Sequence, residues 1–104
     1  MRLKCKITGG TLTARLSGEL DQHSAQQIRA ELDNAAADPS VRRLVFDMNG
    51  LEFMDSAGIG VILGRYKRIA ARGGSFEIVN AHGSVEKLLR ISGVYSLCGE
   101  GGGK

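Results

Sequence analysis

The chain contains no tryptophan, and aromatic residues make up only 5% of its 104 residues. It has no apolar run near the roughly 20 residues that a membrane-spanning helix needs, and its N-terminus lacks the apolar region of a signal peptide. Nucleic-acid-binding domains commonly concentrate basic residues on one face, whereas the net charge of +3 is dispersed here. We therefore expect a cytoplasmic protein that binds neither membranes nor nucleic acid directly.

Cysteine is also scarce. Cys5 and Cys98 lie far apart and lack the close pairing with histidine or further cysteine that a zinc site requires. We interpret both as reduced thiols buried like small apolar side chains. The sequence thus predicts no bound metal and no cofactor.

The length fits one domain, and the shares of hydrophobic residues (42%) and charged residues (24%) are ordinary for a folded protein. Apolar and polar residues alternate on both sides of Gly9-Gly10, which indicates a β-hairpin. A helix is expected over about 24–37, with a capping box formed by Ser24 and Gln27. Residues 41–48 are so apolar that they indicate a central strand covered on both faces.

A second helix is expected over about 57–72. It carries an apolar stripe, with Arg65, Arg68 and Arg72 on the opposite, solvated side. A short strand, a third helix and a final strand over 94–98 follow. The predicted fold is one α/β domain over 1–98, a mixed sheet with helices packed on it in the order β-β-α-β-α-β-α-β. Residues 99–104 are expected to form a flexible glycine-rich tail.

The chain is organised around residues 53–60, where the central strand ends and the second helix begins. Asp55 and Ser56 are residue types that cap helix N-termini. Gly58 and Gly60 lower helix stability in the first turns, which indicates that another strand, a phosphate or a partner protein approaches the backbone closely. Gly60 and Gly64 could instead permit close helix packing, because they lie four residues apart.

The motifs disfavour two interpretations, a phosphate-binding glycine loop and a nucleophilic serine. The glycine spacing matches neither the dinucleotide-binding nor the P-loop pattern. Ser56 lacks the G-x-S-x-G setting of a nucleophile, and His23 and His82 are interpreted as solvated residues near helix starts. The carboxylates at strand ends are interpreted as caps and turn residues rather than metal ligands; they are Glu19, Asp21, Asp47 and Asp55.

The stretch Gly18-Glu19-Leu20-Asp21 and residues 54–67, with the motif Asp-Ser-x-Gly-Ile-Gly, resemble the STAS-domain anti-sigma factor antagonists. The likeness is strongest to the stage II sporulation antagonists of spore-forming bacteria, and it covers roughly residues 3–98. The Asp-Ser motif in this topological position is specific to the family. The chain departs from the family's common pattern at its end, where a glycine-rich tail stands in place of another helix.

The resemblance implies a regulator without catalysis of its own. The unphosphorylated form would bind an anti-sigma factor that is also an ATP-dependent serine kinase, and so release the sigma factor. The kinase would then phosphorylate Ser56, and a separate serine phosphatase would restore the active form. The resemblance also implies a partner surface near this site; its expected residues are Asp21, Asp55, Ser56, Ala57, Gly58, Ile59 and Gly60.

The sequence leaves two other functions open. The chain could be a STAS interaction module of another signalling scaffold, which binds a partner without driving sigma release. An enzyme that uses Ser56 as a nucleophile is disfavoured by the missing motifs.

Overall fold

The computed structural model describes residues 1–98, with the elements in the order β1-β2-α1-β3-α2-β4-α3-α4. The strands are β1 (Arg2–Thr8), β2 (Thr11–Leu20), β3 (Arg43–Met54) and β4 (Ser75–Val79). The helices are α1 (Ala25–Ala36), α2 (Ser56–Ala71), α3 (Gly83–Ser92) and α4 (Val94–Cys98). Residues 99–104, where the sequence predicts a flexible tail, lie outside the described residues.

The four strands form one mixed sheet in the order β1-β2-β3-β4. β1 and β2 are the antiparallel hairpin that the sequence predicts, whereas β2 with β3 and β3 with β4 are parallel. Gly9 and Gly10 turn the hairpin with φ values of 57° and 81°, which glycine adopts without a steric penalty. The predicted α/β fold with a mixed sheet is confirmed.

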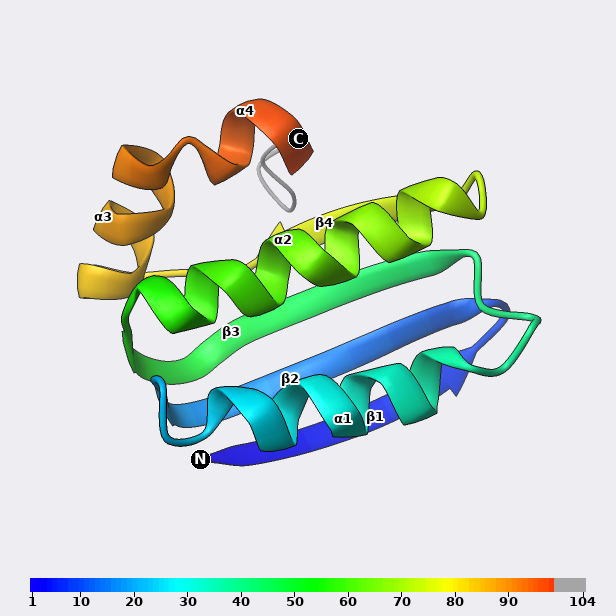
Figure 1. Cartoon of the computed structure of the whole chain (residues 1–104), viewed down its shortest axis with the longest axis horizontal. Helices are drawn as coiled ribbons and strands as arrows, with labels where there is room; N and C mark the ends of the chain where they lie inside the picture. The colour runs from blue at the N-terminus through cyan, green and yellow to red at the C-terminus, as the bar shows by residue number, and fades with distance from the viewer. Residues whose placement is uncertain (99–104) are drawn as a thin grey trace.

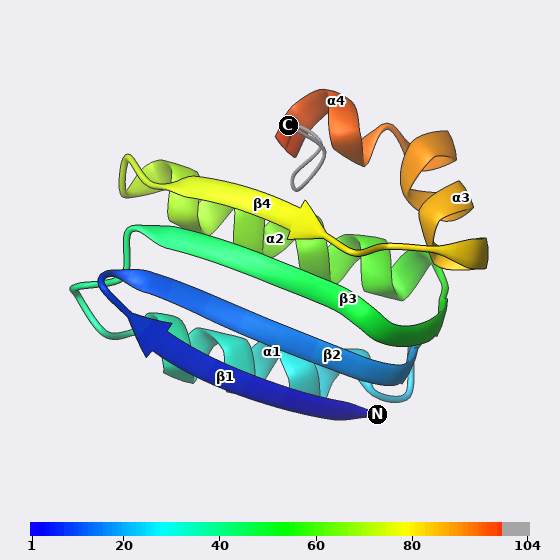
Figure 2. The ribbon, with the colours of Figure 1, turned by 180° about the vertical axis from the view of Figure 1, so that it is seen from behind.

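Both long helices lie over the same face of the sheet. Figure 1 shows α1 and α2 in front of the strands, and in the reverse view of Figure 2 the strands lie in front of both helices. The prediction that both faces of the central strand are covered is therefore wrong. Along β3, Leu44, Phe46 and Met48 are buried, while Val45 and Asp47 between them are only half-buried. Buried and half-buried residues alternate over this run, so it can form a central strand although only one face of the sheet is covered by helices.

Residues 94–98 form helix α4, so the predicted final strand is wrong. Gly93 ends α3 in the left-handed conformation, with φ at 82°, and the chain turns straight into another helical turn. Val94 is buried, and α4 packs against α2 and β4. A run of five residues is too short for its apolar pattern to distinguish a strand from one helical turn.

The prediction that Cys5 is buried is also wrong, because Cys5 is exposed. It lies on β1, an edge strand in which Leu3 alone is even partly buried. The prediction for Cys98 is not tested, because only its backbone belongs to the part of the chain that the structure describes. An edge strand with little helix over it leaves its inward-facing residues accessible, which alternation in the sequence does not reveal.

The start of α1 differs from the predicted capping box. Ser24 occupies the N-cap position but makes no side-chain cap hydrogen bond. Its Oγ instead accepts a hydrogen bond from the Asp21 N–H at 3.1 Å. Gln27 Nε2 donates to Glu31 along the helix at 2.9 Å. The helix still begins next to Ser24 because its apolar residues face the sheet.

The prediction that all three arginines of the second helix lie on its solvated side is wrong for one of them. Arg68 and Arg72 are exposed, but Arg65 is buried between α2 and α1. The Arg65 Nε lies 3.2 Å from Oδ1 of Asp33 on α1. An arginine at the border of an apolar stripe can turn inward when a carboxylate on the neighbouring helix meets it, and no pattern within α2 alone shows this.

Candidate functional site

The candidate site forms where β2 and β3 end at the same edge of the sheet. In the parallel register, Leu20 pairs with Met54 as the last residue of each strand. The Asp55 N–H then donates a hydrogen bond to the Leu20 carbonyl oxygen at 3.3 Å. Asp21 and Asp55, which each follow one of these strands, are therefore brought to neighbouring loops by the sheet.

Asp55 is the N-cap of α2. Its backbone is extended, and its Oδ1 accepts hydrogen bonds from the Ala57 N–H at 2.9 Å and the Gly58 N–H at 3.4 Å. The Ala57 N–H is one of the backbone donors that have no acceptor within the helix, whereas the Gly58 N–H also donates to the Asp55 carbonyl oxygen at 3.0 Å. The carboxylate also lies at the positive end of the helix dipole, which stabilises it further. The interpretation of Asp55 as a capping residue is confirmed.

Ser56 is the first residue of α2 and is exposed. Because Asp55 supplies the cap, the Ser56 hydroxyl is not needed for it. Among residues 1–98, no side-chain hydrogen bond involves the Ser56 Oγ. The structure therefore presents a serine hydroxyl to solvent at the start of a helix whose capping bonds are already made.

The two glycines of this helix start differ in their surroundings. A Cβ at Gly58 would lie 2.3 Å from Met54 Cγ and 3.1 Å from the Leu20 carbonyl oxygen, so this glycine lets the helix start pack against both strand ends. Around Gly60 a Cβ would meet nothing within 4 Å, and Gly60 is exposed. The close approach that the sequence predicts is thus within the chain at Gly58, while Gly60 faces open space.

Gly60 and Gly64 do not serve close packing of another element against the helix, since a Cβ at Gly64 would also meet nothing within 4 Å. That alternative is wrong. Ala57 and Ile59, which are also expected on the partner surface, are half-buried, so each presents part of its surface to solvent. The exposed positions Ser56 and Gly60 lie four residues apart and share one face of the first turns.

Asp21 organises the neighbouring loop. Its Oδ1 accepts hydrogen bonds from the His23 N–H at 2.9 Å and the Ser24 N–H at 3.1 Å. The pKa of the Asp21 carboxyl is below its usual value, first because of the Ser24 backbone hydrogen bond. Asp21 is therefore a negatively charged turn residue at neutral pH, in the second loop of the site.

Phe53 belongs to this region, although sequence reasoning did not assign it to the partner surface. It is 44% exposed, whereas its neighbour Met54 is buried beneath the helix start. Phe53 pairs with the exposed Glu19 of β2, next to the buried pair Leu20 and Met54, so its side chain lies on the open face of the sheet, beside the Asp55 loop. The strand register could have indicated this, since an inward Met54 requires an outward Phe53.

Neither histidine of the described residues is placed to act as a catalytic base for Ser56. His23 lies within the Asp21 loop, and His82 Nε2 is 2.8 Å from the Asn49 carbonyl oxygen. Neither histidine hydrogen bonds to Ser56 in the part of the chain that the structure describes. Within the same residues, no three His, Cys, Asp or Glu side chains gather as a metal site, and no helix is long and apolar enough to cross a bilayer.

A family match and a similar sequence both relate this chain to known proteins. The STAS domain family matches residues 2–98. The anti-sigma F factor antagonist of Paenibacillus polymyxa is 41% identical over 88 residues, which cover 85% of this chain and 75% of that protein.

Two solved structures of SpoIIAA are also similar to this chain. The first is the anti-sigma factor antagonist SpoIIAA in its unphosphorylated form. It matches with a TM-score of 0.72 and 32% identity, and the match covers 86% of this chain and 83% of that one. The phosphorylated form of Bacillus SpoIIAA matches with a TM-score of 0.75 and 30% identity, covering 98% and 93%. On its mixed sheet, its helix arrangement and this match over residues 2–98, the chain belongs to the STAS domain family.

Proposed function

We propose that this protein is an anti-sigma factor antagonist whose binding is switched by phosphorylation of Ser56. The unphosphorylated form binds an anti-sigma factor that is also a serine kinase, and a serine phosphatase reverses the modification. The names of the similar proteins support the antagonist role. The observation that carries the switch is the exposed Ser56 hydroxyl, which is free of hydrogen bonds to residues 1–98 at the start of α2.

The position of Ser56 suits a kinase substrate. A kinase must bring the hydroxyl oxygen in line with the γ-phosphate of ATP, so the oxygen has to be accessible. At Ser56 no capping bond has to break first, because the Asp55 carboxylate already accepts hydrogen bonds from the N–H groups of Ala57 and Gly58. The glycine at position 60 leaves the same face of the helix without a side chain.

The charge of the surroundings explains how a phosphate would act. A phosphoserine carries about −1.5 to −2 charges at neutral pH. The Asp55 carboxylate already occupies two backbone donors that could otherwise bind the phosphate. Asp21, a carboxylate whose pKa lies below its usual value, adds negative charge in the adjoining loop. Phosphorylation therefore makes this edge strongly negative, and a partner surface fitted to a neutral hydroxyl is repelled.

The fold itself need not change on phosphorylation. Ser56 is exposed and at a helix N-terminus, where added negative charge is tolerated. In agreement with this, the chain has similar TM-scores to the unphosphorylated and the phosphorylated forms of SpoIIAA, 0.72 and 0.75. The switch is thus expected to act on the surface at Ser56 rather than by unfolding α2.

Phosphorylation can be tested directly by mass. We expect the purified protein, incubated with ATP and its cognate anti-sigma kinase, to gain one phosphate, about 80 Da by the chemistry of a single modification. A Ser56→Ala variant should gain none. Ser84 is the matched control, since it is also exposed and in the first turn of a helix, α3, so Ser84→Ala should be modified like the unaltered protein. An unmodified protein with an active kinase bound to it would contradict the proposal.

Phe53 should contribute to the partner surface. We expect Phe53→Ser to weaken binding of the anti-sigma factor by about 10- to 100-fold, because exposed aromatic residues near the centre of an interface commonly dominate its energy. Ile7 is the control: it is 40% exposed, nearly as much as Phe53, but it pairs with Leu12 at the other end of the sheet. Titration calorimetry should show equal losses for Ile7→Ser and Phe53→Ser if Phe53 lies outside the interface.

A further inference from the structure

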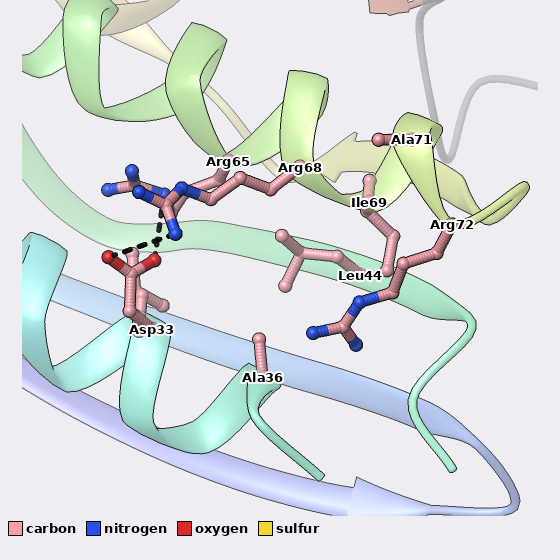
Figure 3. Close-up of a pocket in the computed structure, with 9 residues that line it drawn as sticks. Asp33, Ala36, Leu44, Arg65, Arg68, Ile69, Ala71 and Arg72 are labelled. Atoms are coloured by element: carbon pink, nitrogen blue, oxygen red, sulfur yellow. Dashed lines mark ion pairs between the residues drawn. The ribbon is translucent and has the colours of Figure 1, made fainter. Parts of the chain in front are cut away.

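A groove with a cavity of about 300 Å³ lies between α1 and α2, toward the carboxyl-terminal ends of both helices. Figure 3 shows Asp33 and Ala36 of α1 on one side and the side chains of Arg65, Arg68 and Arg72 reaching from α2 on the other. Arg65 is nine residues beyond Ser56, which places it about 14 Å further along the helix. The groove is therefore separate from the candidate phosphorylation site.

Arg65 is unusual within this groove. Its side chain is only 7% exposed, and its Nε lies 3.2 Å from the Asp33 Oδ1. Even so, neither Nε nor Nη1 of Arg65 makes a hydrogen bond within residues 1–98. Buried charged donors are nearly always hydrogen-bonded, since leaving them unpaired costs free energy. The groove thus contains a guanidinium group with unused donors.

The positive charge around Arg65 is only partly balanced. Asp33 also faces Arg68, whose Nη1 lies 3.8 Å from its Oδ2, and Arg72 Nη1 donates to the Val41 carbonyl oxygen at 3.3 Å. The Asp33 carboxylate is therefore shared by the guanidinium groups of Arg65 and Arg68, and the guanidinium group of Arg72 lines the same groove. The pKa of Arg65 is below its usual value, mainly because the side chain is buried. The charge of Asp33 raises this pKa, and the charges of Arg68 and Arg29 lower it further.

The remaining walls of the groove are apolar. They are formed by Leu32, Ala36, Leu44, Ile69 and Ala71. A binding site that combines such walls with a few convergent polar groups is typical of small-molecule pockets, and its volume is at the lower end of their usual range. Apolar walls around a buried guanidinium group favour a ligand with one anionic group and an apolar chain over a highly charged molecule.

We propose that the groove between α1 and α2 binds a small organic anion with an alkyl chain, whose carboxylate accepts hydrogen bonds from Arg65 and whose chain lies against Leu44 and Ile69. Arg68 is 66% exposed and contacts Asp33 at 3.8 Å only, so it can turn aside at low cost and open the way to Arg65. The bound carboxylate would complete the hydrogen bonding of Arg65 and balance the excess positive charge.

Octanoate is a suitable probe, because it carries one carboxylate on a short alkyl chain. Titration calorimetry on the full chain should show saturable binding of one octanoate, with a Kd below about 1 mM. Inorganic phosphate, which has the charge without the chain, and 1-octanol, which has the chain without the charge, should each bind at least about tenfold more weakly. Equal binding of phosphate would indicate a simple anion site and overturn the proposal, as would the absence of octanoate binding.

Three variants place the binding in the groove. Arg65→Met keeps much of the side-chain length but removes the donors, and Ala36→Leu fills the cavity while leaving Arg65 in place. Each should weaken octanoate binding at least about tenfold. Arg15→Met is the control, since Arg15 is 72% exposed on β2 and does not line the groove. Binding that survives both groove variants would overturn the proposal, whatever the outcome of the Ser56 experiments.

Discussion

We expect Ser56-phosphorylated protein to bind its anti-sigma factor about 100- to 1,000-fold more weakly than the unmodified protein, a loss of roughly 3 to 4 kcal/mol. The reason is local. At the start of α2 the Asp55 carboxylate already accepts the Ala57 and Gly58 N–H groups, so those donors are not free to neutralise a phosphate on Ser56. Inside an interface, the phosphate would have to lose its water without gaining these bonds.

Titration calorimetry with the enzymatically phosphorylated protein measures this loss. Ser56→Ala should bind as tightly as the unmodified protein, because a hydroxyl without hydrogen bonds to residues 1–98 can be removed at little cost to the fold. Ser56→Asp should weaken binding less than the phosphate, since it carries one charge and has a shorter reach. Phosphorylated protein that retains full affinity would contradict a charge switch at Ser56 and favour a scaffold that is not regulated there.

The region around Ser56 could be anticipated because its features are local. Asp55 before Ser56 predicts a capped helix start, and the structure has that cap. The turn at Asp21 could likewise be predicted from the residue type at a strand end. What brings these two loops together is the register of β2 with β3, which depends on packing across the whole sheet rather than on either stretch alone.

The features that sequence reasoning missed all depend on distant contacts. Arg65 is buried because Asp33 meets it from another helix, and a periodicity within α2 cannot show that. Cys5 is exposed because its strand is at the sheet edge, although its alternation resembles that of a buried strand. Phe53 is exposed because its pairing with Glu19 turns it to the sheet face that α1 and α2 leave open, as Figure 2 shows for the two helices.

The buried Arg65 donors without hydrogen bonds in the described residues are expected to lower the stability of the fold. Arg65→Met should raise the free energy of unfolding by about 1 kcal/mol, because it removes buried donors that lack hydrogen bonds within residues 1–98 and keeps the apolar stem in place. Asp33 is partly exposed and keeps its contact with Arg68. Urea unfolding measures the difference, and a clear loss of stability would mean that the Arg65–Asp33 pair stabilises the fold on balance.

The second large effect is expected at Gly58. Gly58→Ala should lower the free energy of unfolding by about 2 kcal/mol, within the usual range for overpacking a tight core position. The added Cβ would lie 2.3 Å from Met54 Cγ and 3.1 Å from the Leu20 carbonyl oxygen, and the backbone oxygen cannot turn aside as a side chain can. Because Leu20 and Met54 end the paired strands, the disturbance would reach the Asp21 and Asp55 loops together.

Gly60→Ala is the matched control, and its effect should have the opposite sign. A Cβ at Gly60 would meet nothing within 4 Å, so the substitution should stabilise the helix by up to about 1 kcal/mol through helix propensity alone. Urea unfolding of both variants separates packing from propensity within one helix turn, and equal effects would contradict the packing role of Gly58. If Gly60→Ala is more stable yet binds the anti-sigma factor more weakly, then a helix-destabilising glycine at this exposed position is explained by the partner's close approach to the backbone beside Ser56.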